Sequence, residues 1–209
     1  MPSAAILLAA GSGERLGAGV PKAFVPLAGR PMVEWSEAAI AAAGLPCVRV
    51  VPEGHDGVTG GATRSQSVRN GLRALAADVD AVVVHDAARP LAPPALFTAC
   101  LEALAGADGA VAATRVTDTV REVEAGVSVR TLDRSRLWAM QTPQAFRRDV
   151  LERALDVGDD VLAQATDDAW LVERAGGRVV VVEALASNFK VTTAHDLAVA
   201  EWLLASKPC

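Results

Sequence analysis

The sequence predicts an α/β fold in which a mostly parallel, twisted sheet carries helices on both faces. Short and wholly apolar runs at residues 4–10 and 81–84 are typical of central strands that are covered on both sides. Between them, a helical segment after residue 61 carries apolar side chains on one face, at Val68, Leu72 and Leu75. Strands that alternate with such helices indicate a Rossmann-like sheet. The 209 residues fit a single domain.

The other elements continue this alternation. Residues 32–43 predict a helix that ends at Gly44, and residues 47–51 predict the next strand. Residues 93–105 predict a helix with prolines at its start, where a missing amide hydrogen costs least. Further elements are expected as a strand at 109–114, helices at 147–157 and 167–175, a strand at 178–182 and a helix at 193–205.

The alternation is interrupted by a segment that resembles a hairpin. Residues 117–123 and 127–132 carry exposed charge on both strands, and Glu124, Ala125 and Gly126 separate them. We therefore expect an arm at about residues 115–136 that projects from the sheet. A two-stranded ribbon is marginal in water and needs a surface to pack on.

Composition excludes several classes of protein. The net charge of −5 and the pI near 5.2 give no broad basic surface, so no nucleic acid partner is expected. The cysteines Cys47, Cys100 and Cys209 are scattered and form no CxxC pair, which argues against a disulfide framework or a zinc site. The N-terminus has no basic region before its short apolar run, so neither a signal peptide nor a membrane span is expected. We expect a cytoplasmic protein.

The first loop, residues 8–24, is the strongest functional signal. A glycine-rich turn after a buried strand lets backbone amides approach phosphate oxygens closely. The loop adds Arg15 and Lys22, two cations suited to a polyphosphate. Its glycines match neither the GxGxxG dinucleotide fingerprint nor the Walker pattern. A tight turn without a ligand would also account for the glycines alone.

The loop string LAAGSGERL…PKAF resembles the nucleotidyltransferases that make nucleoside-diphosphate sugars and alcohols. Further strings, in one order along nearly the whole chain, resemble the 2-C-methyl-D-erythritol 4-phosphate cytidylyltransferase family of the non-mevalonate isoprenoid pathway: GGATRSQSVRNGL, VVVHDAARPL, RVTDTVRE, LDRSRLWAMQTPQAF, ATDDAWLVERAG and NFKVTTAHDLAVAE. The resemblance implies a Rossmann-like nucleotidyltransferase fold with an arm. It also implies transfer of CMP from CTP to 2-C-methyl-D-erythritol 4-phosphate, with release of pyrophosphate.

The resemblance also implies roles for single residues. Arg15 and Lys22 would stabilise charge on the α-phosphate and the leaving pyrophosphate, while Arg134 and Lys190 would hold the attacking phosphate. The nucleotide would be bound by Ala10, Gly11, Gly13, Gly61, Ser67, Asp86 and Ala87. The second substrate would be contacted by Arg89, Thr119, Arg134, Thr142 and Thr166.

A divalent ion, Mg²⁺, and a second subunit are implied as well. Asp86 follows a predicted strand, at the edge where open α/β sheets place their ligands, and would face the metal. The attacking phosphate is already anionic, so positioning and preorganised positive charge would carry the catalysis. In the family the arm embraces a second subunit, so we expect a homodimer in which Thr119 and Arg134 complete the partner's site.

Several alternatives remain open from the residues alone. Another alditol phosphate, such as ribitol 5-phosphate, could be the acceptor on the same scaffold. An NAD-dependent oxidoreductase or an inactive interaction protein would come from a different class. Ala62 stands where other members of the family carry a side-chain acid. A structural role is favoured for His85, core or interface packing for Trp138, and helix capping for Thr166 or Asp167.

Overall fold

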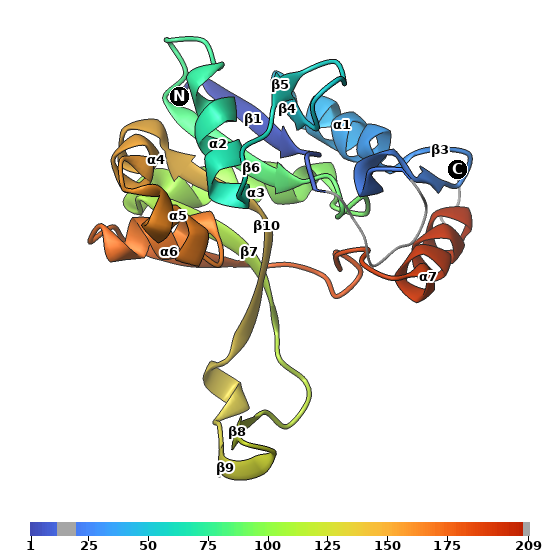
Figure 1. The fold of residues 1–209 in the computed structure, drawn as a ribbon, viewed down its shortest axis with the longest axis vertical. Helices are drawn as coiled ribbons and strands as arrows, with labels where there is room; N and C mark the ends of the chain where they lie inside the picture. Colours follow the sequence, from blue (N-terminus) through green and yellow to red (C-terminus); the bar gives the residue numbers. More distant parts are fainter. Residues whose placement is uncertain (12–19, 207–209) are drawn as a thin grey trace.

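A computed structural model describes residues 1–11 and 20–206 of the chain. Figure 1 shows a central sheet with helices on both sides and an arm that extends away from it. The sheet has seven strands in the order β11-β7-β10-β6-β1-β4-β5. Their bounds are β1 (Ser3–Leu8), β4 (Cys47–Val51), β5 (Val58–Thr59), β6 (Ala81–Asp86), β7 (Gly109–Arg115), β10 (Trp138–Arg147) and β11 (Val179–Glu183).

The prediction of a mostly parallel sheet is confirmed. Strand β1 pairs in parallel with β4 and with β6, and β11 pairs in parallel with β7. Strand β10 is the exception, because it runs antiparallel to both of its neighbours, β6 and β7. The carboxyl ends of β1 and β6 meet at one edge of the sheet, where Leu8 is in register with Asp86.

Helices cover both faces of the sheet. Helices α1 (Met32–Ala42) and α3 (Pro94–Glu102) pack on one face. The other face is covered by α2 (Arg64–Arg73), α4 (Arg148–Leu155), α5 (Asp159–Gln164) and α6 (Asp168–Arg174). The central strands are apolar throughout because successive side chains enter opposite layers: Ala5 and Leu7 of β1 join one core cluster, and Ala4 and Ile6 join the other.

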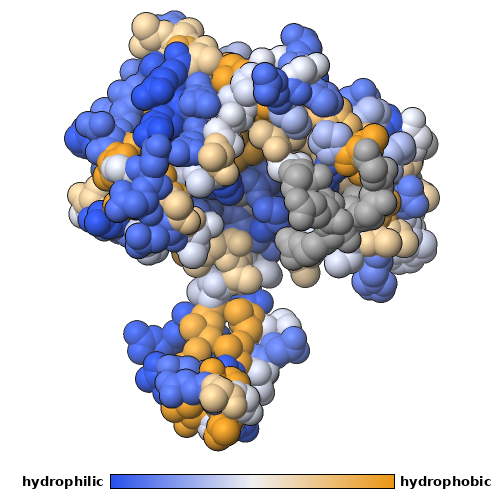
Figure 2. Space-filling view, viewed as in Figure 1, coloured by the Kyte–Doolittle hydropathy of each residue, from blue (hydrophilic) through white to orange (hydrophobic). Residues whose placement is uncertain are grey.

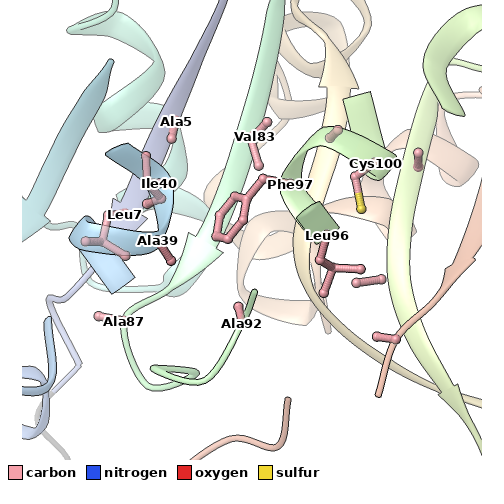
Figure 3. Close-up of a cluster of buried hydrophobic side chains, with 14 of the residues drawn as sticks. Ala5, Leu7, Ala39, Ile40, Val83, Ala87, Ala92, Leu96, Phe97 and Cys100 are labelled. Atoms are coloured by element: carbon pink, nitrogen blue, oxygen red, sulfur yellow. The ribbon is translucent and has the colours of Figure 1, made fainter. Parts of the chain in front are cut away.

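The α1–α3 layer is built around a single aromatic side chain. Figure 3 shows Phe97 of α3 beside Val83 of β6, with Ile40 of α1 in the same layer. All of these side chains are removed from solvent. Full burial of side chains of this size contributes about 1.5–3 kcal/mol each, so the layer holds β6 firmly beneath the site described below.

A third packing unit lies beside the sheet. Helix α7 (Ala194–Ala205) contacts β2 (Pro26–Leu27), which pairs with β3 (Arg30–Pro31). The helix begins with a capping box, in which Thr193 accepts a hydrogen bond from the amide of Asp196 and Asp196 bonds back to the amide of Thr193. Just before β2, the short 3-10 helix Lys22–Phe24 (η2) ends the first loop.

The arm leaves the sheet after β7 and returns along β10 (Figure 1). Its ribbon consists of β8 (Arg121–Glu124) and β9 (Val127–Thr131), so the predicted hairpin is confirmed although its first strand begins later than expected. Ala125 and Gly126 connect the strands with positive φ angles of 47° and 82°. A tight hairpin turn requires this backbone conformation. The short 3-10 helix Arg134–Arg136 (η4) leads back to β10.

Several elements were not predicted from the sequence, among them β10, α5 and the two-residue strands β2, β3 and β5. Strand β10 was not predicted, because its segment WAMQTPQAFR contains a proline and buried polar side chains instead of an apolar run. The strand accommodates Pro143 at a shift of register between Met140 and Gln144, as expected for a proline inside a sheet. Helix α5 was not predicted either, because its 6 residues are too few to show a helical period.

The remaining predicted helices and strands of the sheet are found within a few residues of their expected ends. None of the helices in the described part of the chain has the length and apolar character that crossing a membrane requires.

Helix α2 approaches the sheet so closely that one position accepts no side chain. A Cβ at Gly71 would lie 2.6 Å from Cγ2 of Ile6 and 2.9 Å from Cγ2 of Val50. We expect Gly71→Ala to lower the free energy of unfolding by about 1 kcal/mol, because overpacking of about 1–3 kcal/mol outweighs the roughly 1 kcal/mol gain in helix propensity. Urea denaturation measures this. Gly106→Ala, where a Cβ meets nothing within 4 Å, is the control and should not destabilise. A stabilised Gly71→Ala variant would contradict the packing.

Candidate active site

A pocket opens at the carboxyl edge of the sheet, beyond the ends of β1 and β6. Its volume is about 480 Å³. Figure 2 shows a hollow with hydrophilic residues at its floor, near the middle of the body and above the arm. The wall is made by three stretches of chain, residues 8–11, 22–23 and 61–64, and by four single residues, Ser67, Asp86, Ala88 and Lys190. Open α/β sheets bind their ligands at this place.

The narrow wall of the pocket depends on two glycines. A Cβ at Gly60 would lie 2.5 Å from Cβ of Ala10, and a Cβ at Gly61 would lie 2.4 Å from Cβ of Gln66. The loop after β1 can therefore approach the loop before α2 only because Gly60 has no side chain, and that loop can fold back on α2 only because Gly61 has none. The amide of Gly61 donates a hydrogen bond of 3.0 Å to Oγ of Ser67, which fixes the loop to the first turns of α2.

The start of α2 is fixed by the residues that follow these glycines. Thr63 is the N-cap, and it forms a capping box with Gln66. Arg64, the first residue of the helix, then extends into the pocket wall. Because the cap determines where the helix begins, it also determines where the Arg64 side chain starts.

Asp86 lies at the centre of a cluster of charged side chains. Its Oδ1 accepts a bond of 3.2 Å from Nε of Arg64, and its Oδ2 accepts one of 2.6 Å from Nζ of Lys190. Arg64 also donates from Nη1 to Oδ2 of Asp168, at 2.7 Å. Asp168 is fully buried under the pocket floor. The cluster therefore joins the end of β6, the start of α2, the start of α6 and the segment before α7.

Asp86 and Arg64 each stabilise the ionised form of the other. Burial alone would raise the pKa of Asp86, but Arg64 and Lys190 outweigh it and hold that pKa well below its usual range. Burial likewise opposes the charge of Arg64, while Asp168 and Asp86 raise its pKa above the ordinary value. Both groups are therefore ionised at neutral pH.

Behind Asp86, His85 is part of a buried hydrogen-bond chain. Its Nε2 lies 3.2 Å from the carbonyl of Arg89, which can only accept, so Nε2 carries the proton. Its Nδ1 lies 3.0 Å from the hydroxyl of Thr142, and this hydroxyl also accepts the amide of Asp86. Burial lowers the pKa of His85 to about 4, so the ring is neutral. This arrangement matches the structural role expected for His85.

A second chain of hydrogen bonds connects β10 with the segment that carries Lys190. Asn188 donates from Nδ2 to Oε1 of Gln141 at 2.8 Å and to the carbonyl of Thr142 at 2.9 Å. Arg89 donates from Nη1 to the carbonyl of Asn188 at 2.8 Å. These bonds hold the backbone next to Lys190 against the strand that leads to the arm.

The structure brings together most of the residues expected at the nucleotide. Five of them line the pocket: Ala10, Gly11, Gly61, Ser67 and Asp86. Lys22 and Lys190, which were expected to be catalytic, line it as well. Ala87 is fully buried next to the pocket. Gly13 and Arg15 lie outside the described residues.

The residues expected at the second substrate are more dispersed. Arg89 and Thr142 lie behind Asp86, in the hydrogen-bond chains described above. Thr166 is exposed just before α6, where Asp167 is the capping residue. Thr119 and Arg134 are exposed on the arm, and Arg134 donates to the carbonyl of Thr117. None of these five lines the pocket.

Arg64 was not singled out from the sequence. The only signal was an arginine at the start of a helix, directly after a glycine-rich loop, and such a residue is usually solvated. Asp168, the first residue of α6, is the buried partner of Arg64. Trp138, for which core or interface packing was favoured, lies at the root of the arm, and the guanidinium of Arg115 stands 4.3 Å from the centre of its ring.

The pocket suits a divalent ion that is held mainly by its ligand. The described residues contain no group of three or more His, Cys, Asp or Glu side chains that could hold a metal. Asp86 supplies a single ionised carboxylate at the pocket wall. Mg²⁺ is commonly bound by one or two carboxylates together with substrate phosphates and water, so this donor set fits it.

Known proteins resemble this chain over almost its entire length. A protein from Parasynechococcus marenigrum named 2-C-methyl-D-erythritol 4-phosphate cytidylyltransferase is 44% identical, with 96% of each chain covered. One of the same name from Deinococcus radiodurans is also 44% identical, over 96% of this chain and 89% of its own. The crystal structure of the enzyme of that name from Thermus thermophilus matches with a TM-score of 0.84 and 33% identity, covering 98% of this chain and 100% of the other.

The family assignment follows from a match that spans sheet, pocket and arm together. The sequence model of the IspD family, described as 2-C-methyl-D-erythritol 4-phosphate cytidylyltransferase, matches residues 3–206. This range contains every element of the fold and every pocket residue described above. The chain therefore belongs to the 2-C-methyl-D-erythritol 4-phosphate cytidylyltransferase family.

Proposed function

We propose that this chain transfers CMP from CTP to 2-C-methyl-D-erythritol 4-phosphate and releases pyrophosphate, in the synthesis of isoprenoid precursors. The observation that carries the proposal is the convergence of Lys22, Arg64 and Lys190 with Asp86 on one glycine-walled pocket. The names of the homologous proteins support the identity of both substrates.

The chemistry requires no general base. A phosphate oxygen of the acceptor attacks the α-phosphorus of CTP, and the bond from that phosphorus to the oxygen of pyrophosphate breaks. The barrier lies in bringing two polyanions together and in stabilising the charge that moves onto the leaving group. Lys22, with Arg15 from the same loop, would stabilise that charge, and Lys190 would hold the attacking phosphate.

We propose Mg²⁺ as the cofactor, with Asp86 as its protein ligand. When bound, the ion would neutralise part of the charge on the phosphates. The side chains around Asp86 have a separate task, since Arg64 keeps its carboxylate ionised and the hydroxyl of Thr142 holds its backbone amide.

We also propose a homodimer that forms through the arm. Val123, Val127 and Val129 of the ribbon are 56%, 68% and 53% exposed in the single chain, which leaves an apolar surface uncovered on a two-stranded element. Figure 2 shows apolar residues gathered on the arm. In a two-fold dimer the arm could bring Thr119 and Arg134 to the pocket of the partner.

The expected cytoplasmic location stays a proposal. Its support is that Cys47 and Cys100 are free thiols in the structure.

The first test identifies the substrates and the need for a metal. We expect turnover with CTP and methylerythritol phosphate to exceed that with ATP or GTP by orders of magnitude, and EDTA to abolish it. Pyrophosphate release from each of the four nucleoside triphosphates measures this, with ribitol 5-phosphate as the competing acceptor. Equal rates with all four nucleotides would contradict the assignment as a cytidylyltransferase. Faster turnover of ribitol 5-phosphate would identify that compound as the preferred acceptor.

A second test separates catalysis from binding at the first loop. Because Lys22 and Arg15 are proposed to act on charge that develops in the transition state, Lys22→Ala or Arg15→Ala should lower kcat by about 10²-fold or more, with a smaller change in KM for CTP. Steady-state kinetics measure both constants. Arg153→Ala, which removes an exposed cation from α4, serves as the control. A raised KM with unchanged kcat would mean that these cations only bind the ground state.

The third test concerns the shared site. Lys22→Ala and Arg134→Ala should each be inactive alone, yet their co-expression should recover about a quarter of the wild-type activity. Random pairing makes half of the dimers mixed, and each mixed dimer holds one site without a lesion. Differently tagged chains allow mixed dimers to be isolated before the assay. Inactive mixed dimers would show that each site is built within one chain, and a monomer at micromolar concentration would exclude the dimer.

A further inference from the structure

The two cations that bind Asp86 differ in how firmly they are held. Arg64 binds Oδ1 and Lys190 binds Oδ2, so each occupies its own carboxylate oxygen. Their surroundings are unlike, because the Arg64 side chain is 27% exposed and that of Lys190 is 41% exposed. The difference suggests that only one of them stays with Asp86 during the reaction.

Arg64 is anchored at both ends. Its backbone begins α2 directly after the Thr63 cap, and its Nη1 is bonded to Asp168 at 2.7 Å. The Asp168 side chain has no exposure to solvent, and its Oδ1 has no hydrogen-bond partner among the described residues. If Arg64 moved away, a buried carboxylate would lose its counter-charge, which is strongly unfavourable. Arg64 therefore stays in place.

Lys190 is anchored only through its backbone. The neighbouring amide of Val191 donates to the carbonyl of Ala88 at 2.8 Å, and Asn188 is held by Gln141. The side chain itself reaches across the pocket mouth to Asp86 on a flexible four-carbon stem. A compact ammonium on such a stem can exchange one anionic partner for another without any change in the backbone.

We propose that Arg64 is the fixed counter-charge of Asp86, and that its presence allows Lys190 to leave Asp86 for the phosphate of the second substrate. Arg64 is then a positioning residue, since it acts through Asp86 and Lys190. The inference rests on the proposed function, in which Lys190 holds the attacking phosphate.

The electrostatic reason is the balance within the cluster. Asp86 and Asp168 contribute two negative charges, and Arg64 and Lys190 contribute two positive ones. Without Arg64, one of the two described ion pairs of Asp86 would be lost and the pair with Lys190 would remain, and repulsion between Lys190 and the guanidinium would be lost as well. Both changes strengthen the pair between Lys190 and Asp86. The lysine would then be retained by the carboxylate when the acceptor phosphate arrives.

The test compares two variants with a matched control. Arg64→Gln removes the counter-charge, and Arg64→Gln combined with Asp168→Asn also removes the buried carboxylate that would be left unpaired. Arg69→Gln is the control, because it removes an arginine from the same helix that pairs with the exposed carboxylate of Asp159. Urea denaturation of each variant is measured first, and kinetics are compared only for variants that unfold cooperatively as the wild type does.

The first readout needs no substrate. Trace acetylation of the ligand-free protein, followed by mass spectrometry against an added reference peptide, measures how readily the amine of Lys190 reacts. An amine that is held against a carboxylate is less accessible to the reagent than one that moves away from it. We expect labelling of Lys190 to fall about threefold or more in both Arg64 variants and to stay at the wild-type level in Arg69→Gln. Unchanged or increased labelling would overturn the inference.

The second readout compares the change in KM for the acceptor phosphate with the change in KM for CTP. We expect KM for the acceptor phosphate to rise about tenfold in the double variant, with a smaller change in KM for CTP. The reverse pattern would mean that Arg64 binds the nucleotide itself, and recovery of wild-type kinetics in the double variant would mean that it only stabilises the fold. Either result overturns the proposal. An inactive wild-type enzyme would instead overturn the proposed function.

Discussion

The need to neutralise a carboxylate at the end of a central strand determines how this site is assembled. Asp86 closes β6, in the middle of the sheet, and little of it reaches solvent. A buried charge is tolerated only when it is paired and hydrogen-bonded. The cluster meets this requirement with an arginine from α2 and a lysine from the segment before α7, one on each carboxylate oxygen. Segments that are distant in sequence are thereby drawn to one point, and the pocket is the space between them.

The fold could be predicted where its physical signals are local. Apolar runs of β1 and β6, helix caps and the positive-φ turn of the arm all depend on neighbouring residues, and these elements were recognised. Strand β10 was missed because its stability depends on distant partners. Gln141, Thr142 and Gln144 are buried there only because Asn188, His85 and Asp167 supply hydrogen bonds, and no pattern within the strand reveals those partners.

The same distinction applies to the site. The glycines beside the pocket, Lys22 and Asp86 could be placed from the sequence, because they stand on loops at the carboxyl ends of strands. Arg64 could not, since its function is defined by Asp168, which is separated from it by 104 residues along the chain. The residues on the arm were expected only from the family resemblance, because in the single chain they do not line the pocket.

The attachment of the arm also bears on how this enzyme can diversify. Both ends of the arm enter neighbouring strands, where Arg115 is in register with Trp138 and stacks on its ring. The sheet therefore sets the distance between those ends, whatever lies beyond them. Lengthening a loop between fixed ends raises its closure entropy only slowly. Insertions and deletions at the tip are consequently tolerated without disturbing the strands beneath the pocket. The arm can drift in length and sequence while the body that carries the pocket is inherited unchanged.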